Sequence, residues 1–571
     1  MALGISSQSA QALNLTTPGT PVSSYPTLNN LSIDWPINDD DDLDGRVTVR
    51  YRKVGTSSWQ TGLPLQRVPA GSNEGFSWGN KHSGSIFDLL PNTEYEIELS
   101  LNDPDGGSTT RLFNASTRAE PSVPASAAIV PATPASFSSV LASASPGTVI
   151  VMASGSYTGF TVNTSGTNVA PIVFRAEDPG TTVVNGDIRM DGRSNIFIEG
   201  LTVNGMVKFN DASAIVVRGC TVITDTDGIV STGGGVSNAY IADNVVIGSS
   251  VWTNESVGAN GANLGEGIQL TGPGNVIVHN YVRGFRDSIS TLEGSRAHNQ
   301  VSIDIMNNDI EIGADDAIEA DFTMGNTRVM RNRISNSFVG ISGQPTLGGP
   351  AYYIRNVMYN VVYSPFKLHR GSIGDVALHN TVVKSGDAFA VYASDPWARA
   401  LFRNNLFIGG TGGGTYGGFG NGSGRVAQLS GAENTCDLNY DGWGSIGTGN
   451  FSGNIGGNSF SSLSGMRSSS TETNAIQVDM SIFAAPVVFP SDGPFPELPV
   501  ADLRLAAGSV AQDAGQILPN INNDYTGTAP DLGAYEIGDS LPVYGPRPGR
   551  HPGYDSTDTL APSAPTNLQA N

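Results

Sequence analysis

The sequence has few charged residues, an acidic excess and no long apolar run. Asp, Glu, Lys and Arg make up 14% of the 571 residues, and 52 acidic against 30 basic side chains give a net charge of −22. Because basic patches supply the affinity for nucleic acids and anionic membranes, neither is an expected partner. No apolar run approaches the roughly 18 residues that a membrane-spanning helix needs. The composition therefore argues against a nucleic-acid-binding protein, a protein of anionic membrane surfaces and a protein with a membrane-spanning helix.

Cysteine is also scarce. The two cysteines, Cys220 and Cys436, are far apart, which argues against a disulfide framework. The first twenty residues lack the basic start and apolar core of a signal peptide. Glycine, by contrast, is abundant, with 71 residues, which is typical of a chain with many turns and short strands.

Six short segments repeat one pattern between Glu266 and Tyr392. Each places one apolar residue between more polar neighbours, as in a half-buried strand. The segments are EGIQL, DSIST, DAIEA, VGISG, PFKLH and DAFAV, with Ile268, Ile289, Ile318, Ile341, Phe366 and Phe389 at their centres. A period in the twenties with short strands predicts a parallel β-helix.

A column of asparagines gives the register of the repeat. Asn332, Asn356, Asn380 and Asn404 follow one another at intervals of 24 residues. Asn244, Asn280 and Asn308 extend the column backwards with looser spacing, and Cys220 falls in the same column. Stacked asparagines satisfy one another's amides along in-register coils. We therefore predict that the four evenly spaced asparagines, from Asn332 to Asn404, stack inside the solenoid.

The repeat places charged residues on one surface. Glu266, Asp287 and Asp316 lie two positions before the central apolar residue, and Glu319 and Lys367 lie just after it. Since adjacent coils are about 4.8 Å apart, Lys367 is expected two rungs, on the order of 10 Å, from Glu319. Such stacked carboxylates repel one another unless a cation binds, and Ca²⁺ is the hard cation that oxygen ligands favour.

The flanking regions resemble known modules. The string LLPNTEY from Leu89 to Tyr95 places a tyrosine after a proline turn, and this stretch resembles the fibronectin type III family, whose domains commonly act as spacers or docking modules. The stretch from Ala135 to Gly159, with a short amphipathic helix that would cover the open end of the solenoid, resembles the opening of pectate-lyase-like β-helix enzymes.

We therefore predict an all-β chain, a right-handed parallel β-helix preceded by a fibronectin type III-like β-sandwich. The expected parts are a flexible segment (1–20), the sandwich (21–118), a linker (119–134), the catalytic β-helix (135–485), a C-terminal segment packed on it (486–550), and a linker with the start of a truncated second fibronectin-like domain (551–571). Within the β-helix, the glycine-rich region 409–457 is expected to form loops with little sign of rungs.

The charged pattern also resembles polysaccharide lyase family 9. In that family an Asp, a DDxxD strand and a Lys in an F-K-L context form a Ca²⁺ site and a base for pectate elimination. The resemblance implies Asp287, Asp315, Asp316 and Glu319 as Ca²⁺ ligands and Lys367 as the base, with Glu319 standing where the motif has Asp. His369 could donate or accept a proton, and Arg370 could neutralise a substrate carboxylate.

Two other functions remain open on the sequence. Glu319 and Asp321 share one face of a strand, as the acid and base of an inverting glycoside hydrolase would, and some β-helix carrageenases resemble this arrangement. A non-catalytic glycan-binding adhesin is the third possibility. The first choice is a secreted, monomeric, Ca²⁺-dependent lyase that cleaves an acidic polysaccharide.

Overall fold

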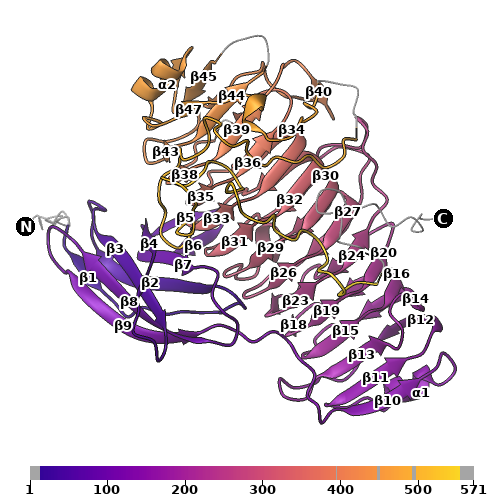
Figure 1. Ribbon diagram of the computed structural model, residues 1–571. Coiled ribbons are helices and arrows are strands. Elements are labelled where there is room, and N and C mark those ends of the chain that lie inside the picture. The colour runs from indigo at the N-terminus through magenta and orange to yellow at the C-terminus, as the bar shows by residue number, and fades with distance from the viewer. Residues whose placement is uncertain (1–12, 394, 447–450, 492–496, 553, 555–571) are drawn as a thin grey trace, which may run out of the picture.

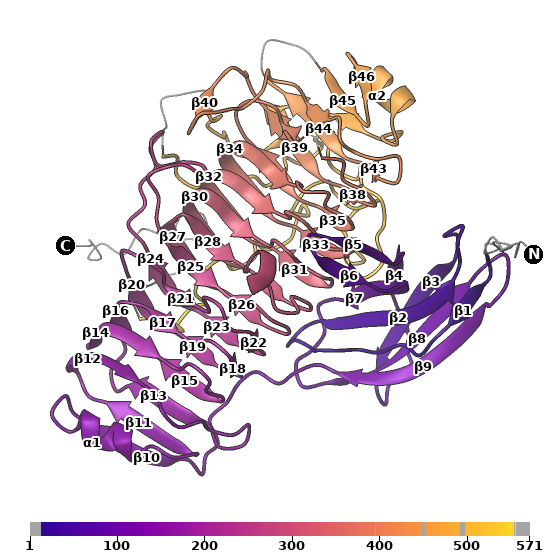
Figure 2. The same ribbon diagram turned by 180° about the vertical axis from the view of Figure 1, so that it is seen from behind.

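The computed structural model describes residues 13–393, 395–446, 451–491, 497–552 and 554. It consists of an N-terminal antiparallel β-domain, here residues 13–118, and a long parallel β-helix against which that domain lies (Figures 1 and 2). The predicted fold class is confirmed by these two parts. Among the described residues, no helix is long and apolar enough to cross a membrane. The expected second fibronectin-like domain lies almost wholly outside the described residues.

The N-terminal β-domain is a seven-stranded antiparallel sheet with one added hairpin. In sheet order its strands are β1 (Thr16–Pro18), β2 (Leu31–Asp39), β7 (Lys81–Ile86), β4 (Gln60–Val68), β3 (Arg46–Lys53), β8 (Glu94–Asn102) and β9 (Thr109–Ser116), and the hairpin is β5 (Gly71–Asn73) and β6 (Phe76–Trp78). Inward residues of β3 and β8 alternate with exposed ones, as period-2 patterning requires. Tyr95 Oη accepts a hydrogen bond from the Leu90 amide at 2.9 Å, as a tyrosine corner needs. Thr16–Pro18, expected to be flexible, instead pairs with β2.

The β-helix is built from a 13-stranded and a 17-stranded parallel sheet. The first contains β10 (Ala128–Ala132), β11 (Thr148–Met152), β13 (Ile172–Ala176), β15 (Ile196–Glu199), β19 (Val216–Arg218), β23 (Tyr240–Ala242), β26 (Val276–Val278), β29 (Asp304–Met306), β31 (Thr327–Met330), β33 (Ala351–Ile354), β35 (Asp375–Leu378), β38 (Leu401–Arg403) and β43 (Asp437–Asn439). Its first strand, β10, lies in the segment expected to be a linker.

The 17-stranded sheet covers the other two sides of the coil. It contains β12 (Gly155–Thr161), β14 (Thr182–Arg189), β16 (Thr202–Asn204), β17 (Val207–Lys208), β20 (Thr221–Ile223), β21 (Ile229–Val230), β24 (Val245–Ile247), β25 (Glu266–Gln269), β27 (Tyr281–Phe285), β28 (Asp287–Ser290), β30 (Asp309–Glu319), β32 (Arg333–Ser342), β34 (Val357–Lys367), β36 (Thr381–Val383), β39 (Leu406–Gly409), β44 (Gly442–Ser445) and β47 (Ile476–Gln477). β30 pairs with β27 through its first half and with β28 through its second half, so it turns a corner. Left-handed residues Ile312, Asn336 and Asn360, 24 positions apart, mark this corner.

Smaller elements complete the molecule. They are α1 (Phe137–Ala142), α2 (Leu463–Ser469), the 3₁₀ turns η1 (Gly294–Arg296) and η2 (Met480–Ile482), and the short strands β18 (Ala212–Ser213), β22 (Val236–Ser237), β37 (Phe389–Ala390), β40 (Thr415–Tyr416), β41 (Phe419–Gly420), β42 (Ala427–Leu429), β45 (Gly453–Ile455) and β46 (Asn458–Phe460).

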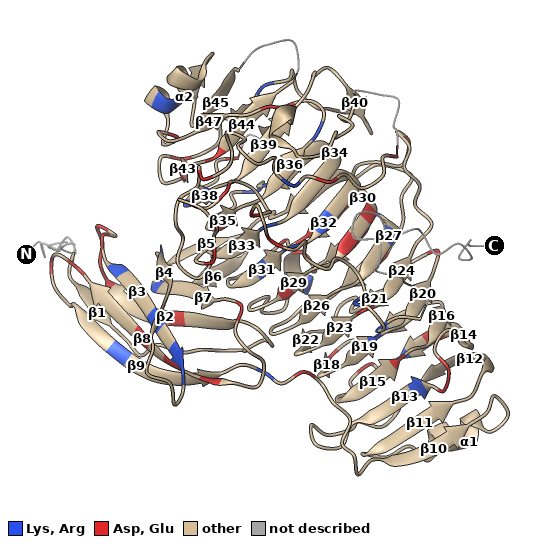
Figure 3. Ribbon diagram, viewed as in Figure 1, with Lys and Arg blue, Asp and Glu red and all other residues tan. Residues whose placement is uncertain are grey.

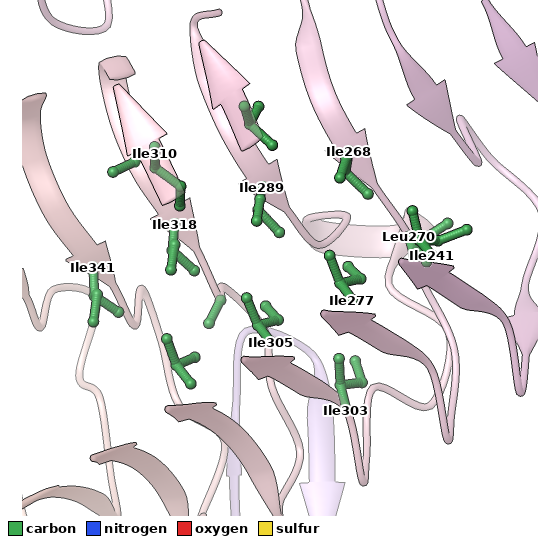
Figure 4. Close-up of a cluster of buried hydrophobic side chains, with 14 of the residues drawn as sticks. Ile241, Ile268, Leu270, Ile277, Ile289, Ile303, Ile305, Ile310, Ile318 and Ile341 are labelled. Carbon is green, nitrogen blue, oxygen red and sulfur yellow. The ribbon is translucent and has the colours of Figure 1, made fainter. Parts of the chain in front are cut away.

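A column of apolar side chains fills the centre of the coil and confirms the predicted register. Ile268 pairs with Ile289, Ile289 with Ile318, and Ile318 with Ile341, and all four are fully buried (Figure 4). Phe366 follows Ile341 in the same register. Phe389 belongs to a different sheet, with β42, but its ring lies 5.6 Å from that of Phe366.

The asparagine ladder forms as predicted except at its last position. Asn332 Nδ2 donates to Asn356 Oδ1, and Asn356 Nδ2 to Asn380 Oδ1, both at 3.0 Å. The next rung is Asn405, and the prediction of Asn404 is wrong. The coil after Asn380 is one residue longer than 24, so Asn404 falls on the left-handed position (φ 61°) that precedes each ladder residue. Asn404 instead bonds to the His379 ring.

A short helix covers the first end of the solenoid, and toward the other end the rungs continue further than expected. As predicted, a short helix closes the first end: the ring of Phe137 in α1 lies 4.9 Å from that of Phe160. Towards the other end, β43 and β44 extend both sheets, so the expectation of loops without rungs across 409–457 is wrong. The described part of 486–550 runs along the outside of the coils, where Leu503 and Leu532 join a core with Val383 (Figure 1).

The N-terminal β-domain packs against the β-helix through a buried interface. The ring of Phe87 lies 5.0 Å from that of Tyr352. Arg328 and Asp304, both completely buried, form an ion pair at 2.5 Å, and Arg328 also donates to the hydroxyl of Ser85 across the interface. The ion pair lies within the β-helix, and each partner also bonds to the N-terminal β-domain, since Asn30 Nδ2 donates to Asp304 Oδ2 at 2.8 Å. These buried polar contacts fix the two parts in one arrangement.

Candidate active site

The charged residues of the repeat gather on one outer face of the 17-stranded sheet. In the second half of β30, Ala317 and Ile318 belong to the core of the coil, whereas Asp315, Asp316 and Glu319 carry the charge of this strand and are themselves buried. Figure 3 is viewed from the side of β24 and β27, and the acidic and basic segments that it shows on β30 and β32 belong to the first halves of these strands, where Arg333 pairs with Asp309. Glu319 pairs with Ser342 and Ser342 with Lys367, so the predicted two-rung separation is confirmed.

Two overlapping groups of carboxylates lie close enough to share a cation. Oxygens of Glu266, Asp287 and Glu319 lie within 4.8 Å of one another, and so do oxygens of Glu293, Glu319 and Asp321. Glu319 belongs to both groups. Carboxylate oxygens are the ligands that Ca²⁺ prefers, and Asp321 Oδ2 is buried without a hydrogen-bond partner, as a vacant ligand position would be. The residues present therefore fit a hard cation.

Burial makes this concentration of negative charge costly. Burial and the charges of Asp287 and Asp321 raise the pKa of Glu319 well above its usual value. Burial, with the charge of Glu266 next, does the same to the pKa of Asp287. The pKa of Glu266 is raised to about 7, chiefly by burial. Protons or a cation must offset part of this charge.

Lys367 is the cation that the chain itself supplies. Its Nζ lies 2.5 Å from Asp316 Oδ2, and only 13% of its side chain is exposed. Burial alone would lower the pKa of Lys367, but the charges of Asp316, Asp321 and Asp315 outweigh it and hold that pKa well above its usual value. With these carboxylates charged, the amine keeps its proton.

Asp315 and Asp316 lie beside the carboxylate groups rather than within them. Asp316 is held by Lys367, and its amide donates to Asp287 Oδ1 at 2.8 Å. Asp315 lies 3.5 Å from the guanidinium of Arg286, which lies equally close to Asp287. Of the four predicted ligands, the structure thus brings Asp287 and Glu319 into the first group and places Asp315 and Asp316 at its basic edge.

His369 and Arg370, the two residues after Leu368, have different surroundings. Burial, followed by the charge of Lys367, lowers the pKa of His369 to about 4, so its ring is neutral at pH 7 and is a poor proton donor. Arg370 turns toward the N-terminal β-domain, where Glu74 binds it through Nε at 2.9 Å and Nη2 at 2.7 Å. Its Nη1 lies 3.8 Å from Glu293.

Sequence reasoning missed three participants as site residues. Glu266 stood in the carboxylate column but was outside the family resemblance, and its register could have included it. Arg286 immediately precedes Asp287, and this adjacency in the sequence was the one signal that could have indicated it. Glu293 lies in a loop before η1 with no periodic position, so only the folded chain brings it to Glu319.

Comparisons with known proteins give distant matches among solved structures. No family model and no curated protein matches the sequence. Similar solved structures include the PL6-family alginate lyase AlyGC, at 12% identity and a TM-score of 0.36, with 65% of this chain and 60% of that chain covered. Another is a mannuronic acid-specific family 6 polysaccharide lyase from human gut microbiota, at 16% identity and a TM-score of 0.29, with 56% and 76% covered. A point mutant of AlyGC matches at 15% identity and a TM-score of 0.29, with 61% and 57% covered.

The match spans about three fifths of AlyGC. These three structures are family 6 lyases, and the family 9 resemblance of the charged motif stays a prediction. At these identities and TM-scores the argument about function depends on the residues of the site.

Proposed function

We propose that the chain is a polysaccharide lyase that cleaves a uronate-containing polymer by β-elimination. The observation that carries the proposal is the contact of Lys367 with Asp316 beside two carboxylate groups joined by Glu319, all on one face of a parallel β-helix. An amine beside a cation-binding carboxylate cluster is the pairing that elimination next to a carboxylate requires.

The chain's own residues would divide the work as follows. Either carboxylate group, that of Glu266, Asp287 and Glu319 or that of Glu293, Glu319 and Asp321, would hold the cation, which we propose to be Ca²⁺. When bound, it would offset their charge and that of the substrate's C6 carboxylate, acidifying the C5 proton. Lys367 can act as the base only as a neutral amine, so once the charge of the carboxylates that raise its pKa is offset, it would first release its proton to solvent. Its Nζ would then take the C5 proton, the C4–C5 double bond would form, and the glycosidic bond to O4 would break. Because His369 is neutral, we assign protonation of the leaving oxygen to water rather than to this ring.

The inverting hydrolase has less support from the geometry. Oxygens of Glu319 and Asp321 lie within 4.8 Å, whereas inversion needs carboxyl groups about 6.5–9.5 Å apart to admit a water molecule. Asp321 is also tied down on one side, since its Oδ1 accepts hydrogen bonds from Ser342 at 2.6 Å and from the Gln344 amide at 2.8 Å. The carboxylates are spaced as ligands rather than as an inverting pair.

The remaining properties follow from this chemistry. We propose an extracellular location, because polymeric uronates are encountered outside cells, and a monomeric catalytic unit. The fibronectin type III identity of the N-terminal β-domain is likewise a proposal, supported by its antiparallel strands and by the Tyr95 hydrogen bond. A glycan-binding adhesin would need none of the buried charge around Lys367.

The test is product analysis on a panel of acidic polysaccharides. We expect unsaturated uronate ends, detected by their ultraviolet absorbance, and loss of this activity by about 10²–10⁴-fold in Lys367→Ala. Lys367→Arg should not restore it, because a guanidinium keeps its proton. Lys208→Ala is a matched control: Lys208 occupies the same column of the same sheet, with Val230, Gln269, Ser290, Glu319 and Ser342 between it and Lys367. Reducing ends without unsaturation would establish a hydrolase, and no cleavage would favour a binding protein.

A further inference from the structure

The β5–β6 hairpin of the N-terminal β-domain reaches the edge of the candidate active site. β5 pairs with β6 through Asn73 and Phe76, and the two-residue loop between them is Glu74-Gly75. Figure 2 shows the hairpin beside the ends of β31 and β33, next to the strands that carry the acidic residues. The ring of Phe76 lies 5.9 Å from that of Phe322, the residue directly after Asp321.

The tip of this hairpin has an unusual residue in a demanding conformation. Both loop residues have positive φ, 49° at Glu74 and 84° at Gly75, as in the type I′ turn that favours Asn-Gly or Asp-Gly. A glutamate in this left-handed conformation lacks the local side-chain hydrogen bonding that makes asparagine and aspartate tolerable there. A cost of this kind is kept where the surroundings use the side chain.

Glu74 and the preceding residue, Asn73, both form hydrogen bonds with Arg370. Glu74 accepts two hydrogen bonds from the guanidinium, and Asn73 Nδ2 donates to the carbonyls of Arg370 at 2.9 Å and Gly371 at 3.1 Å. The Arg370 guanidinium also lies 5.1 Å from the ring centre of Phe322. Backbone, side-chain end and one face of Arg370 are thus all fixed by contacts at the hairpin.

One edge of the guanidinium is held less closely than the other. Glu74 occupies Nε and Nη2, whereas Nη1 lies 3.8 Å from Glu293, itself a member of the second carboxylate group. The Arg370 side chain is 35% exposed. A planar guanidinium held at one edge can still donate from the other edge to a carboxylate.

We propose that the N-terminal β-domain is part of the active site, with Glu74 as a positioning residue that holds Arg370 to bind a uronate carboxylate next to the sugar that reacts. The inference rests on the proposed lyase function and adds a second recognition point for the polymer. It replaces the expected role of this domain as a spacer with a role in substrate binding. The strain of the turn, the bidentate contact and the longer, 3.8 Å contact of Nη1 all concern Arg370 and the residue that holds it.

The experiment compares two truncations at the same domain interface. Glu74→Ala removes the grip on Arg370. Asp88→Ala is the matched control. Asp88 binds Arg331 through two oxygens at 3.1 and 2.7 Å, and Arg331 lies beside the ladder residue Asn332 rather than at the carboxylate groups. We expect Glu74→Ala to raise KM for a uronate polymer by about tenfold, the scale of one charge-assisted hydrogen bond, with little change in kcat. Asp88→Ala should leave both parameters unchanged, with similar melting temperatures for the two variants.

A double-mutant cycle shows whether Glu74 acts through Arg370. Arg370→Ala should raise KM at least as much as Glu74→Ala, and the double variant should match Arg370→Ala alone. Additive effects, equal effects of Glu74→Ala and Asp88→Ala, or a lower KM in Glu74→Ala would each overturn the positioning role. Glu74→Gln, which keeps the hairpin's shape, replaces Glu74→Ala if that variant fails to fold. Wild-type protein that cleaves no uronate polymer would overturn the proposed function and this inference together, whereas a normal wild type with an unaffected Glu74→Ala overturns only the inference.

Discussion

Removing one rung of the asparagine ladder should cost far more than removing a similar contact on the surface. The Asn356 side chain makes four hydrogen bonds inside the coil. Its Oδ1 accepts from the amide and from Nδ2 of Asn332, both at 3.0 Å, and its Nδ2 donates to the Val329 carbonyl at 2.9 Å and to Asn380 Oδ1 at 3.0 Å. In Asn356→Ala the Asn332 amide loses this partner in a place that water does not reach.

The magnitude follows from which groups are left without partners. Asn332 Nδ2 still donates to the Ile305 carbonyl at 2.9 Å, so the main penalty is the stranded amide and the unfilled space. A buried donor left without a partner costs about 1–3 kcal/mol, and the lost packing adds to it, so we expect about 2–4 kcal/mol of lost unfolding free energy.

An exposed pair of asparagines provides the control. Asn204 Nδ2 donates to Asn185 Oδ1 at 2.9 Å, one coil apart, but both side chains are exposed. Asn204→Ala should cost less than about 0.5 kcal/mol because water replaces the lost partner. Urea unfolding of both variants, with the slope of the transition checked for change, measures the difference. Equal losses in the two variants would refute the argument that burial makes the ladder stabilising.

Three further predictions concern ions and charge. Ca²⁺ at a hundredfold excess over its Kd should add about 2.7 kcal/mol to the free energy of unfolding and so raise the melting temperature. Chelation or Glu319→Gln should remove that gain. Burial and the charge of Arg67 lower the pKa of His82 to about 4, below its usual value near 6.5. The neutral ring is therefore favoured in the fold, its stabilisation is present above pH 6.5 and lost as the pH falls to 4, and His82→Gln should reduce this pH dependence of unfolding by up to about 3 kcal/mol. Asp304→Ala should cost about 3–5 kcal/mol in chemical unfolding, because it leaves Arg328 buried without its anion, whereas a change below about 1 kcal/mol would show that the interface is hydrated.

The parts of the fold that repeat were predictable from the sequence. Ile268, Ile289, Ile318 and Ile341 share one inward position because side chains alternate along a strand and coils stack in register. Asn404 shows the limit of that reasoning: one extra residue in a coil moves the ladder to Asn405, and nothing in the local sequence shows where the insertion is absorbed. The rungs β43 and β44 were missed because glycine-rich strands have little apolar alternation.

The candidate site was predictable only where it follows the repeat. Glu319 and Lys367 occupy periodic positions, so their separation could be counted in rungs. Glu293 lies in a loop and Glu74 lies in another domain, and both reach the site through tertiary contacts between segments distant in the chain. Expecting the N-terminal β-domain to be a spacer followed from its module type, which contains no information about where its hairpins dock.

A solenoid places equivalent positions of successive coils directly above one another, so a repeated charge is a repeated repulsion. Elsewhere on the coil this chain avoids the problem: the inward column is isoleucine and phenylalanine, and the polar column is asparagine, whose amides pair with themselves. Glu266 and Asp287 occupy directly paired positions on adjacent rungs, and Glu319 lies within reach of both. An uncharged residue at each of these positions would avoid the repulsion and destabilise the fold less. The carboxylates are therefore explained by what they bind. Local rules of stability are broken here in several adjacent residues at once, and that is the strongest physical reason to place the chemistry at this face.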